Sequence, residues 1–392
     1  MSANRRLKYN IPVLYILKIA KWFMLVMPII VVFYQENGLS MKDVFILQAI
    51  YSIAIFVLEI PSGYFADVLG RKNTLLAGAF FGFLGYGIYT VSYSFVGFLF
   101  AELAMGIGQS FISGADSALL YDTLAEQKKE KHYLKFEGRL VSTGNFAEAI
   151  AGILGGLLAE ITIRTPFYFQ AGVAFMAIPA ALFITEPYRH KIAGKMSFKN
   201  IMDVVRHSLR EDKKLRNAIL FSSIIGTSTL TMAWFVQPYF KMVDLPLAMF
   251  GVLWTFLNLS VGITALFAHK VEQWFGRKNF VLFIAISIPL GYFLVSQFNA
   301  LWAISFLFIF YLIRGVATPV LKNYINIITT SDVRATVLSV RNFIIRLNFS
   351  LIGPFLGWYT DTLSLSAALF LAFIIFLTFS LIAAVLFVRK MN

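Results

Sequence analysis

Long apolar runs, following one another along the whole chain, limit the folds open to this sequence more than any other feature. A helix needs about 20 mostly apolar residues to cross the hydrocarbon core of a bilayer, and about twelve stretches of that length occur here. The chain is 59% hydrophobic and 14% charged, against about 45–50% and about 25% in ordinary soluble domains. Only helices and closed barrels can span lipid. We therefore predict an all-α membrane protein whose apolar runs are its transmembrane helices.

The predicted spans lie at residues 11–34, 43–66, 73–94, 95–124, 137–160, 166–186, 216–240, 246–268, 279–298, 300–328, 335–360 and 365–388. The first is too long for the apolar core of a signal peptide, so we expect it to be retained. One long polar interruption, from Glu186 to Arg216, divides the chain nearly in half. We therefore expect an N-terminal six-helix bundle at 1–188, a cytoplasmic central loop at 189–214 and a C-terminal six-helix bundle at 215–392.

The basic residues predict the orientation in the membrane. A formal net charge of +14 could indicate nucleic-acid binding in a soluble protein, but in a membrane protein it indicates cytoplasmic loops rich in Lys and Arg. If both termini are cytoplasmic, the opposite side holds only Lys42, Arg164 and Lys241 among its loops. We expect a monomer in the bacterial inner membrane, surrounded by the lipid bilayer, with both termini cytoplasmic and with no nucleic-acid partner.

The two halves of the sequence repeat one another. Four matches occur at nearly the same offset, about half the chain length: Gly70-Arg71-Lys72-Asn73 with Gly276-Arg277-Lys278-Asn279, Pro28 with Pro238, Gly106 with Gly315, and Arg139 with Arg341. Each match alone is weak, but together they indicate a duplicated six-helix unit. Parallel repeats of this kind are typical of transporters in which two halves rock about a central site.

The loop after the second span carries the most specific motif. Gly63, Asp67, Gly70, Arg71 and Lys72 fit the pattern Gly-x-x-x-Asp-x-x-Gly-Arg-Lys. This pattern resembles the signature of the major facilitator superfamily, and the resemblance extends to the span count, the central loop and the duplication. Gly276, Arg277 and Lys278 stand where that family places a second, degenerate copy, in which Gln273 replaces the aspartate and Glu272 is adjacent.

The resemblance implies roles for these residues. In the family, the two loop motifs form a cytoplasmic gate, the arginine pairs with an acid at the end of helix 4, and the aspartate lies near the start of helix 11. Arg71 with Asp122 and Asp67 are the matching residues, and Asp332 and Arg334 would take part in the mirrored arrangement with Arg277.

Two departures from the family pattern concern proton coupling. Glu102, an acid, stands four residues before Gly106, where many members have an arginine in helix 4. In helix 5 the glycine run Ala151-Gly152-Ile153-Leu154-Gly155-Gly156 lacks the proline of the family's antiporter motif, while Gly353-Pro354-Phe355-Leu356-Gly357 is a similar run in helix 11. Close helix packing is the alternative role for these glycines.

Ionisable residues inside spans are expensive to bury and therefore functional candidates. The candidates for proton coupling are Glu148, Glu102, Asp116 and Glu59, with Glu148 near the bilayer centre. Glu102 and Asp116 are almost four helical turns apart, so we expect them to share a face of helix 4. The candidates for substrate binding are Lys21, Arg314, Arg346, Trp22 and Trp234. Structural ion pairs between helices remain the alternative for every charge, and Lys21 could neutralise Glu148 or Glu59.

Several chemistries find no support in the sequence. There is no cysteine, the four histidines form no metal-ligand spacing, and no phosphate-binding loop or nucleophile elbow is present. We therefore expect no cofactor, no metal site and no enzymatic activity.

These patterns predict a secondary active transporter that moves a small-molecule substrate by alternating access. The leading hypothesis is proton-coupled export of an amphiphilic drug or metabolite. The alternative is transport of an organic anion or anionic amphiphile, with uptake as the direction to consider, because the C-terminal spans carry Arg314, Lys322 and Arg346 but no acid. A third hypothesis is a non-transporting receptor or assembly factor on the same fold.

Overall fold

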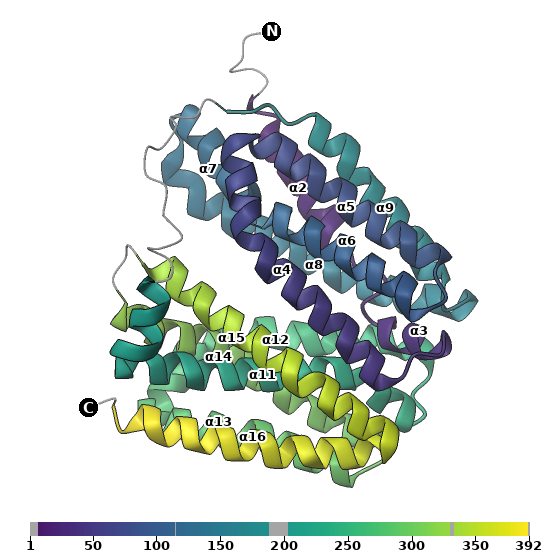
Figure 1. Ribbon diagram of the computed structural model, residues 1–392, viewed down its shortest axis with the longest axis vertical. Coiled ribbons are helices and arrows are strands. Elements are labelled where there is room, and N and C mark those ends of the chain that lie inside the picture. The colour runs from purple at the N-terminus through teal and green to yellow at the C-terminus, as the bar shows by residue number, and fades with distance from the viewer. Residues whose placement is uncertain (1–6, 114, 188–202, 330–332, 391–392) are drawn as a thin grey trace. The chain divides into compact units, whose positions relative to one another are not determined.

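Helices make up nearly all of the chain that the structure describes, which confirms the predicted all-α fold class (Figure 1). The computed structural model describes residues 7–113, 115–187, 203–329 and 333–390. Within these ranges only the backbone is described at Glu59, Ile60, Gly63, Tyr64, Asp67, Val68, Glu130, Leu134 and Ala335. Most of the predicted central loop, 189–214, lies outside the described residues.

The N-terminal part of the described chain contains α2 (Asn10–Trp22), α3 (Ile30–Glu36), α4 (Met41–Val68), α5 (Arg71–Val91), α6 (Phe95–Ile112), α7 (Ala115–Glu126), η1 (Glu130–His132), α8 (Tyr133–Ile161) and α9 (Thr165–Leu182). The C-terminal part contains η2 (His207–Glu211), α11 (Lys213–Met242), α12 (Leu247–Phe275), α13 (Arg277–Gln297), η3 (Leu301–Phe306), α14 (Leu307–Ile328), α15 (Arg334–Thr362) and α16 (Leu365–Val388).

Ten stretches of the described chain are long and apolar enough to cross a membrane. The two predicted spans outside this set deviate for different reasons. The first, 11–34, is divided into α2 and α3. The other, 335–360, forms the 29-residue helix α15, whose arginines and asparagines lower its hydropathy.

Specific contacts stabilise the non-helical break between α2 and α3 in the first span. Phe23 leaves the helical conformation with ψ of 71°, and Pro28, which has no N–H, cannot donate a backbone hydrogen bond across the gap. The backbone N–H of Leu25 donates to Oε1 of the fully buried Gln170 on α9 at 2.7 Å. A Cβ atom at Gly155 of α8 would collide with the carbonyl oxygen of Leu25, so this glycine allows the broken backbone to approach α8.

The chain divides into two compact units. Unit 1 comprises Met1–Leu39, Ile50–Lys191 and Leu247–Thr255. Unit 2 comprises Ser40–Ala49, Ile192–Pro246 and Phe256–Asn392. The first part of α4 therefore packs within unit 2, and the first part of α12 packs within unit 1.

The two units use the same packing devices at matching positions. Gly70 has φ of +100° and Gly276 has φ of +70°, and each precedes a 21-residue helix, α5 or α13. A Cβ atom at Gly106 of α6 would meet Ala54 of α4 at 2.9 Å, and one at Gly315 of α14 would collide with Thr264 of α12. The same pair of elements thus packs through a glycine in each unit, which supports the duplication read from the sequence.

The two glycine runs also serve matching contacts. In unit 1, Cβ atoms at Gly152 and Gly156 of α8 would meet Thr255 at 2.8 Å and Gly251 at 2.9 Å, both in the first part of α12. In unit 2, a Cβ atom at Gly357 of α15 would meet the carbonyl oxygen of Met41, in the first turn of α4, at 2.7 Å. Close helix packing, the alternative raised from the sequence, is what these glycines provide.

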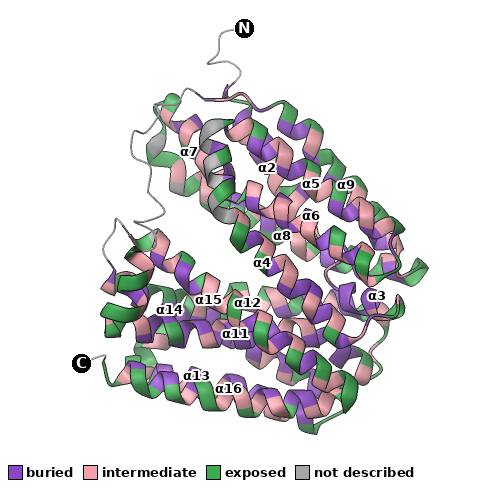
Figure 2. Cartoon of the chain, viewed as in Figure 1, coloured by how far each residue is buried: buried purple, intermediate pink, exposed green. Residues whose placement is uncertain are grey.

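Several helices are apolar on every side. On α16 the buried Ala372 and Phe376 alternate with exposed Ile374 and Phe379 (Figure 2). A helix that buries one apolar face in protein and exposes another is typical of a span in contact with lipid.

Candidate functional site

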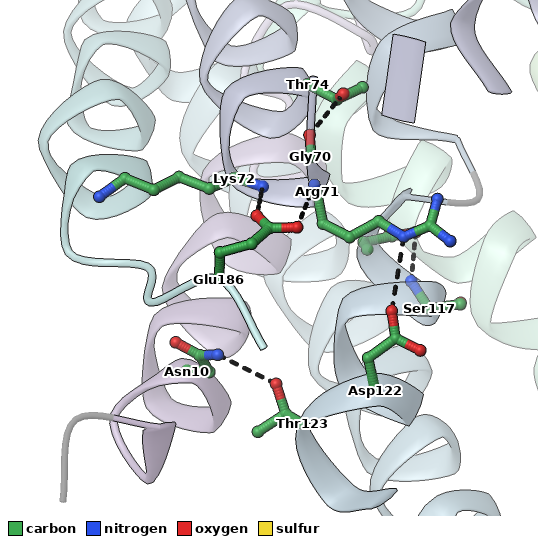
Figure 3. Close-up of polar contacts among 10 residues, drawn as sticks. Asn10, Gly70, Arg71, Lys72, Thr74, Ser117, Asp122, Thr123 and Glu186 are labelled. Atoms are coloured by element: carbon green, nitrogen blue, oxygen red, sulfur yellow. Dashed lines mark hydrogen bonds and ion pairs between the residues drawn. The ribbon is translucent and has the colours of Figure 1, made fainter. Parts of the chain in front are cut away.

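The loop between α4 and α5, the first loop motif, is closed by a carboxylate from a distant part of the chain (Figure 3). Glu186 follows α9, and its two carboxylate oxygens accept the backbone N–H groups of Arg71 at 2.9 Å and Lys72 at 2.8 Å. These N–H groups begin α5 and have no partner within the helix. A negative charge at a helix N-terminus is further stabilised by the helix dipole.

Gly70 lets the Glu186 carboxylate approach this closely. Its φ of +100° is a conformation that a side-chain-bearing residue rarely adopts, and a Cβ atom there would lie 3.0 Å from the carboxyl carbon of Glu186. The signature glycine thus has a definite physical role in this chain.

A buried asparagine fixes the segment that carries Glu186. Asn10, at the start of α2, donates from Nδ2 to Oγ1 of Thr123 at 3.0 Å and to the carbonyl oxygen of Thr185 at 2.8 Å. Its Oδ1 accepts the N–H of Thr185 at 2.9 Å. Asn10 therefore joins α2 to α7, as Figure 3 shows for Thr123, and to the residue next to Glu186.

The signature arginine pairs as the resemblance implied. Nε of Arg71 lies 3.6 Å from Oδ2 of Asp122 on α7, and Nζ of Lys72 donates to the carbonyl oxygen of Leu182 at 2.7 Å. These contacts lie within unit 1. The side chain of Asp67 and residue Gly63 are on the part of α4 where only the backbone is described, so the role of Asp67 stays a prediction.

The second loop motif, between α12 and α13, uses different partners. Nε of Arg277 lies 3.6 Å from Oε1 of Glu272, and the same oxygen accepts the hydroxyl of Tyr324 on α14 at 2.8 Å. Gly276 begins α13 with its φ of +70°, and the neighbouring Lys278 is exposed. Glu272 is thus the acidic partner of Arg277 in unit 2, as Asp122 is the acidic partner of Arg71 in unit 1.

Of the two residues before α15 that were expected to take part with Arg277, only Arg334 is described. Nη2 of Arg334 faces the carbonyl oxygens of Asn326 and Thr329, both at 3.4 Å, and Asp332 lies outside the described residues.

A mixed charge cluster lies where α2 meets α7. Nζ of Lys18 is 3.8 Å from Oδ2 of Asp116 and 5.9 Å from the ring centre of Trp22. Lys21, one turn further along α2, also interacts electrostatically with Asp116. Asp116 therefore has Lys18 as its ion-pair partner and Lys21 as a second cation within electrostatic range.

Glu102 lies in a separate, fully enclosed cluster. Its side chain on α6 is 3% exposed, and Oε1 accepts the hydroxyls of Tyr34 at 2.7 Å and Tyr89 at 2.6 Å. The expectation that Glu102 and Asp116 share one helix face is wrong. The helix ends at Ile112 and Ser113 is extended, with ψ of 121°, so Asp116 belongs to another helix, α7.

The other candidates lie on several different helices. Glu148 on α8, Trp234 on α11 and Arg346 on α15 are half-buried, Arg314 on α14 is exposed, and the side chain of Glu59 is not described.

Three residues that complete these clusters were not among the predicted site residues. They are Glu186, which the sequence marks only as the start of the polar interruption, and Tyr34 and Tyr89. Glu186 could have been found from the general rule that the first N–H groups of a helix need an acceptor. For the tyrosines no local signal exists, because their partner lies on another helix.

No group of three or more His, Cys, Asp or Glu side chains arranged to hold a metal ion occurs among the described residues.

The chain resembles known transporters in sequence. The model of the Major Facilitator Superfamily matches residues 14–352. A transporter of that superfamily from Methanocaldococcus jannaschii is 28% identical over 160 residues, 40% of this chain and 39% of the relative. The quinolone resistance protein NorA from Staphylococcus aureus is 23% identical over 171 residues, 43% of each chain. The chain thus spans about two fifths of the length of these curated relatives.

Solved structures show the same fold along nearly the whole chain. The nucleoside transporter NupG aligns with a TM-score of 0.76 at 14% identity, covering 100% of both chains. A bacterial homologue of the human lysosomal transporter Spinster aligns with a TM-score of 0.75 at 14% identity, covering 99% of this chain and 97% of that one. The family match, the spans and the fold together show that this integral membrane protein belongs to the Major Facilitator Superfamily.

Proposed function

We propose that the protein exports a small amphiphilic compound in exchange for protons, by alternating access, from the cytoplasm of a bacterium whose inner membrane it spans. Both termini, and with them the two loop motifs, lie on the cytoplasmic side in this proposal, because that orientation places the basic residues inside. The name of the NorA relative, which refers to quinolone resistance, supports export of aromatic amphiphiles.

The observation that carries the proposal is the ion pair of Asp116 with Lys18. The two side chains are 3.8 Å apart and are only 20% and 16% exposed, so bulk water screens their attraction weakly. A proton on Asp116 removes the negative charge and with it the attraction to Lys18 and Lys21. Protonation of this one group can therefore loosen α2 from α7.

The elements that carry the pair are suited to such movement. Lys18 lies near the end of α2, before the break at Phe23, and Asp116 lies in the first turn of α7, after the helix end at Ile112. Discontinuous helices in transporters commonly carry the ion and substrate sites. Glu102 is less suited to exchange protons, since the enclosed cluster of Tyr34 and Tyr89 would have to open first.

Proton movement into proteoliposomes tests the proposal directly. Purified protein is reconstituted with an enclosed pH-sensitive dye, and a quinolone is added on one side. We expect substrate-driven proton movement in the unaltered protein, loss of it in Asp116→Asn, and retention in Glu160→Gln, an exposed acid at the end of α8. Glu148→Gln, measured in parallel, tests the acid that the sequence places near the bilayer centre. The coupling proposal is wrong if neither Asp116→Asn nor Glu148→Gln changes the proton signal.

A further inference from the structure

A buried arginine in unit 2 has no acidic partner among the residues whose side chains the structure describes. Arg341 on α15 is 5% exposed. Its Nε donates to Oγ of Ser222 on α11 at 2.5 Å, and its Nη1 donates to Oδ1 of Asn342 at 3.0 Å. Both acceptors are neutral, and among the described residues Nη2 of Arg341 has no hydrogen-bond partner.

The helices around Arg341 supply no compensating charge. No Asp or Glu occurs on α11 or α14, and the only acid on α15 is Asp361 near its far end. The carboxylate of Asp361 is occupied by the N–H groups of Met41 and Lys42, both at 2.8 Å. Lys322 of α14 interacts electrostatically with Arg341, but it is a second cation.

Hydrogen bonds to two buried serines of α11 organise the site around Arg341. Ser222 and Ser223 are both fully buried, and Oγ of Ser223 donates to the carbonyl oxygen of Arg341 at 3.2 Å. α11 therefore holds the backbone of α15 as well as the guanidinium group at this level. A guanidinium held in place with unused N–H donors is a ready binding group for a carboxylate or phosphate.

Burying a charge without an opposite charge is strongly unfavourable, and such a group persists where function requires it. We propose that Arg341 binds the anionic head group of the transported compound, with Lys322 as a second cation. The inference rests on the proposed transport function and specifies its substrate class: an amphiphile with a carboxylate or phosphate group. It places the anion contact at a residue other than the Arg314 and Arg346 considered from the sequence.

The arrangement of α14 gives the anion an approach. Arg314, Thr318 and Lys322 are spaced by four residues, so they follow one another along a single face of the helix. Arg314 and Lys322 are both exposed. An anion attracted by these side chains arrives beside Lys322, within electrostatic range of Arg341.

A set of naphthalene derivatives with the same ring and different head groups tests the proposal. Binding of 1-naphthoate, 1-naphthyl phosphate, 1-naphthylmethanol and 1-naphthylmethylamine to the protein in lipid nanodiscs is measured by calorimetry. We expect one or both anions to bind and the alcohol and the amine to bind at least about tenfold more weakly. The comparison of naphthoate with naphthyl phosphate distinguishes the carboxylate from the phosphate.

Two variants with a matched control locate the site. Arg341→Gln should weaken anion binding by about tenfold or more, and Lys322→Gln should weaken it less. Arg389→Gln, at the exposed end of α16, should leave it unchanged.

Arg341→Met should raise the midpoint of thermal unfolding of the ligand-free protein, because an uncompensated buried charge is replaced by an apolar group of similar length. A merely structural arginine would give the opposite thermal shift.

The outcomes separate this inference from the proposed function. Anion binding that depends on Arg341, in a protein that moves no protons, would support the inference and reject proton coupling. Proton-coupled transport of a quinolone together with equal binding of all four naphthalene compounds would support the function and reject the inference. Anion binding that is unchanged in Arg341→Gln would also reject it.

Discussion

The carboxylate of Glu186 accepts the backbone N–H of Arg71 at 2.9 Å although 115 residues separate them along the chain. This bond and its neighbour at Lys72 cap α5. Loss of a helix cap destabilises a protein by about 1 kcal/mol, and the charge adds a favourable interaction with the helix dipole. We expect Glu186→Ala to lower the midpoint of thermal unfolding in detergent by a few degrees, while Glu160→Ala, at the exposed end of α8, changes it little. Equal stability of the two variants would contradict the capping role.

Gly70 and Gly276 offer a matched pair of substitutions. Both have positive φ, but a Cβ atom at Gly70 would crowd Glu186 at 3.0 Å, whereas one at Gly276 would meet nothing within 4 Å. Backbone strain of about 1–3 kcal/mol is common to both positions. We expect Gly70→Ala to destabilise the protein more than Gly276→Ala, measured by thermal unfolding. The difference should disappear in a Glu186→Ala background, and a difference that persists there would exclude crowding as its cause.

Asp67 is predicted to act in gating rather than in binding. The family resemblance places it at the cytoplasmic gate with Arg71 and Asp122, where it would stabilise the outward-open state. Asp67→Asn should therefore abolish transport in proteoliposomes and leave substrate affinity unchanged in nanodiscs. Loss of binding together with transport would assign the residue to another role.

The tyrosines around Glu102 are predicted to be its essential partners. Removing the hydroxyls in Tyr34→Phe with Tyr89→Phe leaves a buried carboxyl group without these donors, which destabilises a protein by about 1–3 kcal/mol per unsatisfied group. Tyr93→Phe, at an exposed ring, is the control. We expect the double variant to unfold at a lower temperature than the control. Unchanged thermal stability would show that other groups hold Glu102.

Features that depend on local composition could be predicted from the sequence. The apolar runs, the duplicated loop motifs and the pairing of Arg71 with Asp122 follow from hydropathy, repetition and a family pattern. The break between α2 and α3 could not be predicted in the same way. Pro28 was visible in the sequence, but the matching Pro238 lies inside the continuous helix α11. The difference arises from Gln170 and Gly155, which lie on other helices and accommodate the open backbone only in the N-terminal half.

The same distinction, between features of the local sequence and contacts from other helices, applies to the functional clusters. Individual acids inside spans were identifiable because any such charge is conspicuous, but their partners were not. Asp116 pairs with Lys18 and Glu102 with two tyrosines because α7 begins a new helix after Ser113. Helical spacing places Glu102 and Asp116 on one face only if the helix between them is continuous. Arg341 was noticed only as a repeat match, since burial without a counter-charge is a property of the fold.

The break in the first span has a further consequence for these two acids. α3 holds Tyr34 against Glu102, whereas α2 holds Lys18 against Asp116, and the non-helical residues from Phe23 to Ile29 separate the two attachments. A continuous helix would transmit a rotation from one end to the other. Two short helices joined by non-helical backbone, such as α2 and α3, do not. Movement of α2 at Asp116 is therefore not transmitted through the first span to the buried tyrosine cluster around Glu102. Substitutions in the two clusters should consequently have additive effects on the stability of the protein.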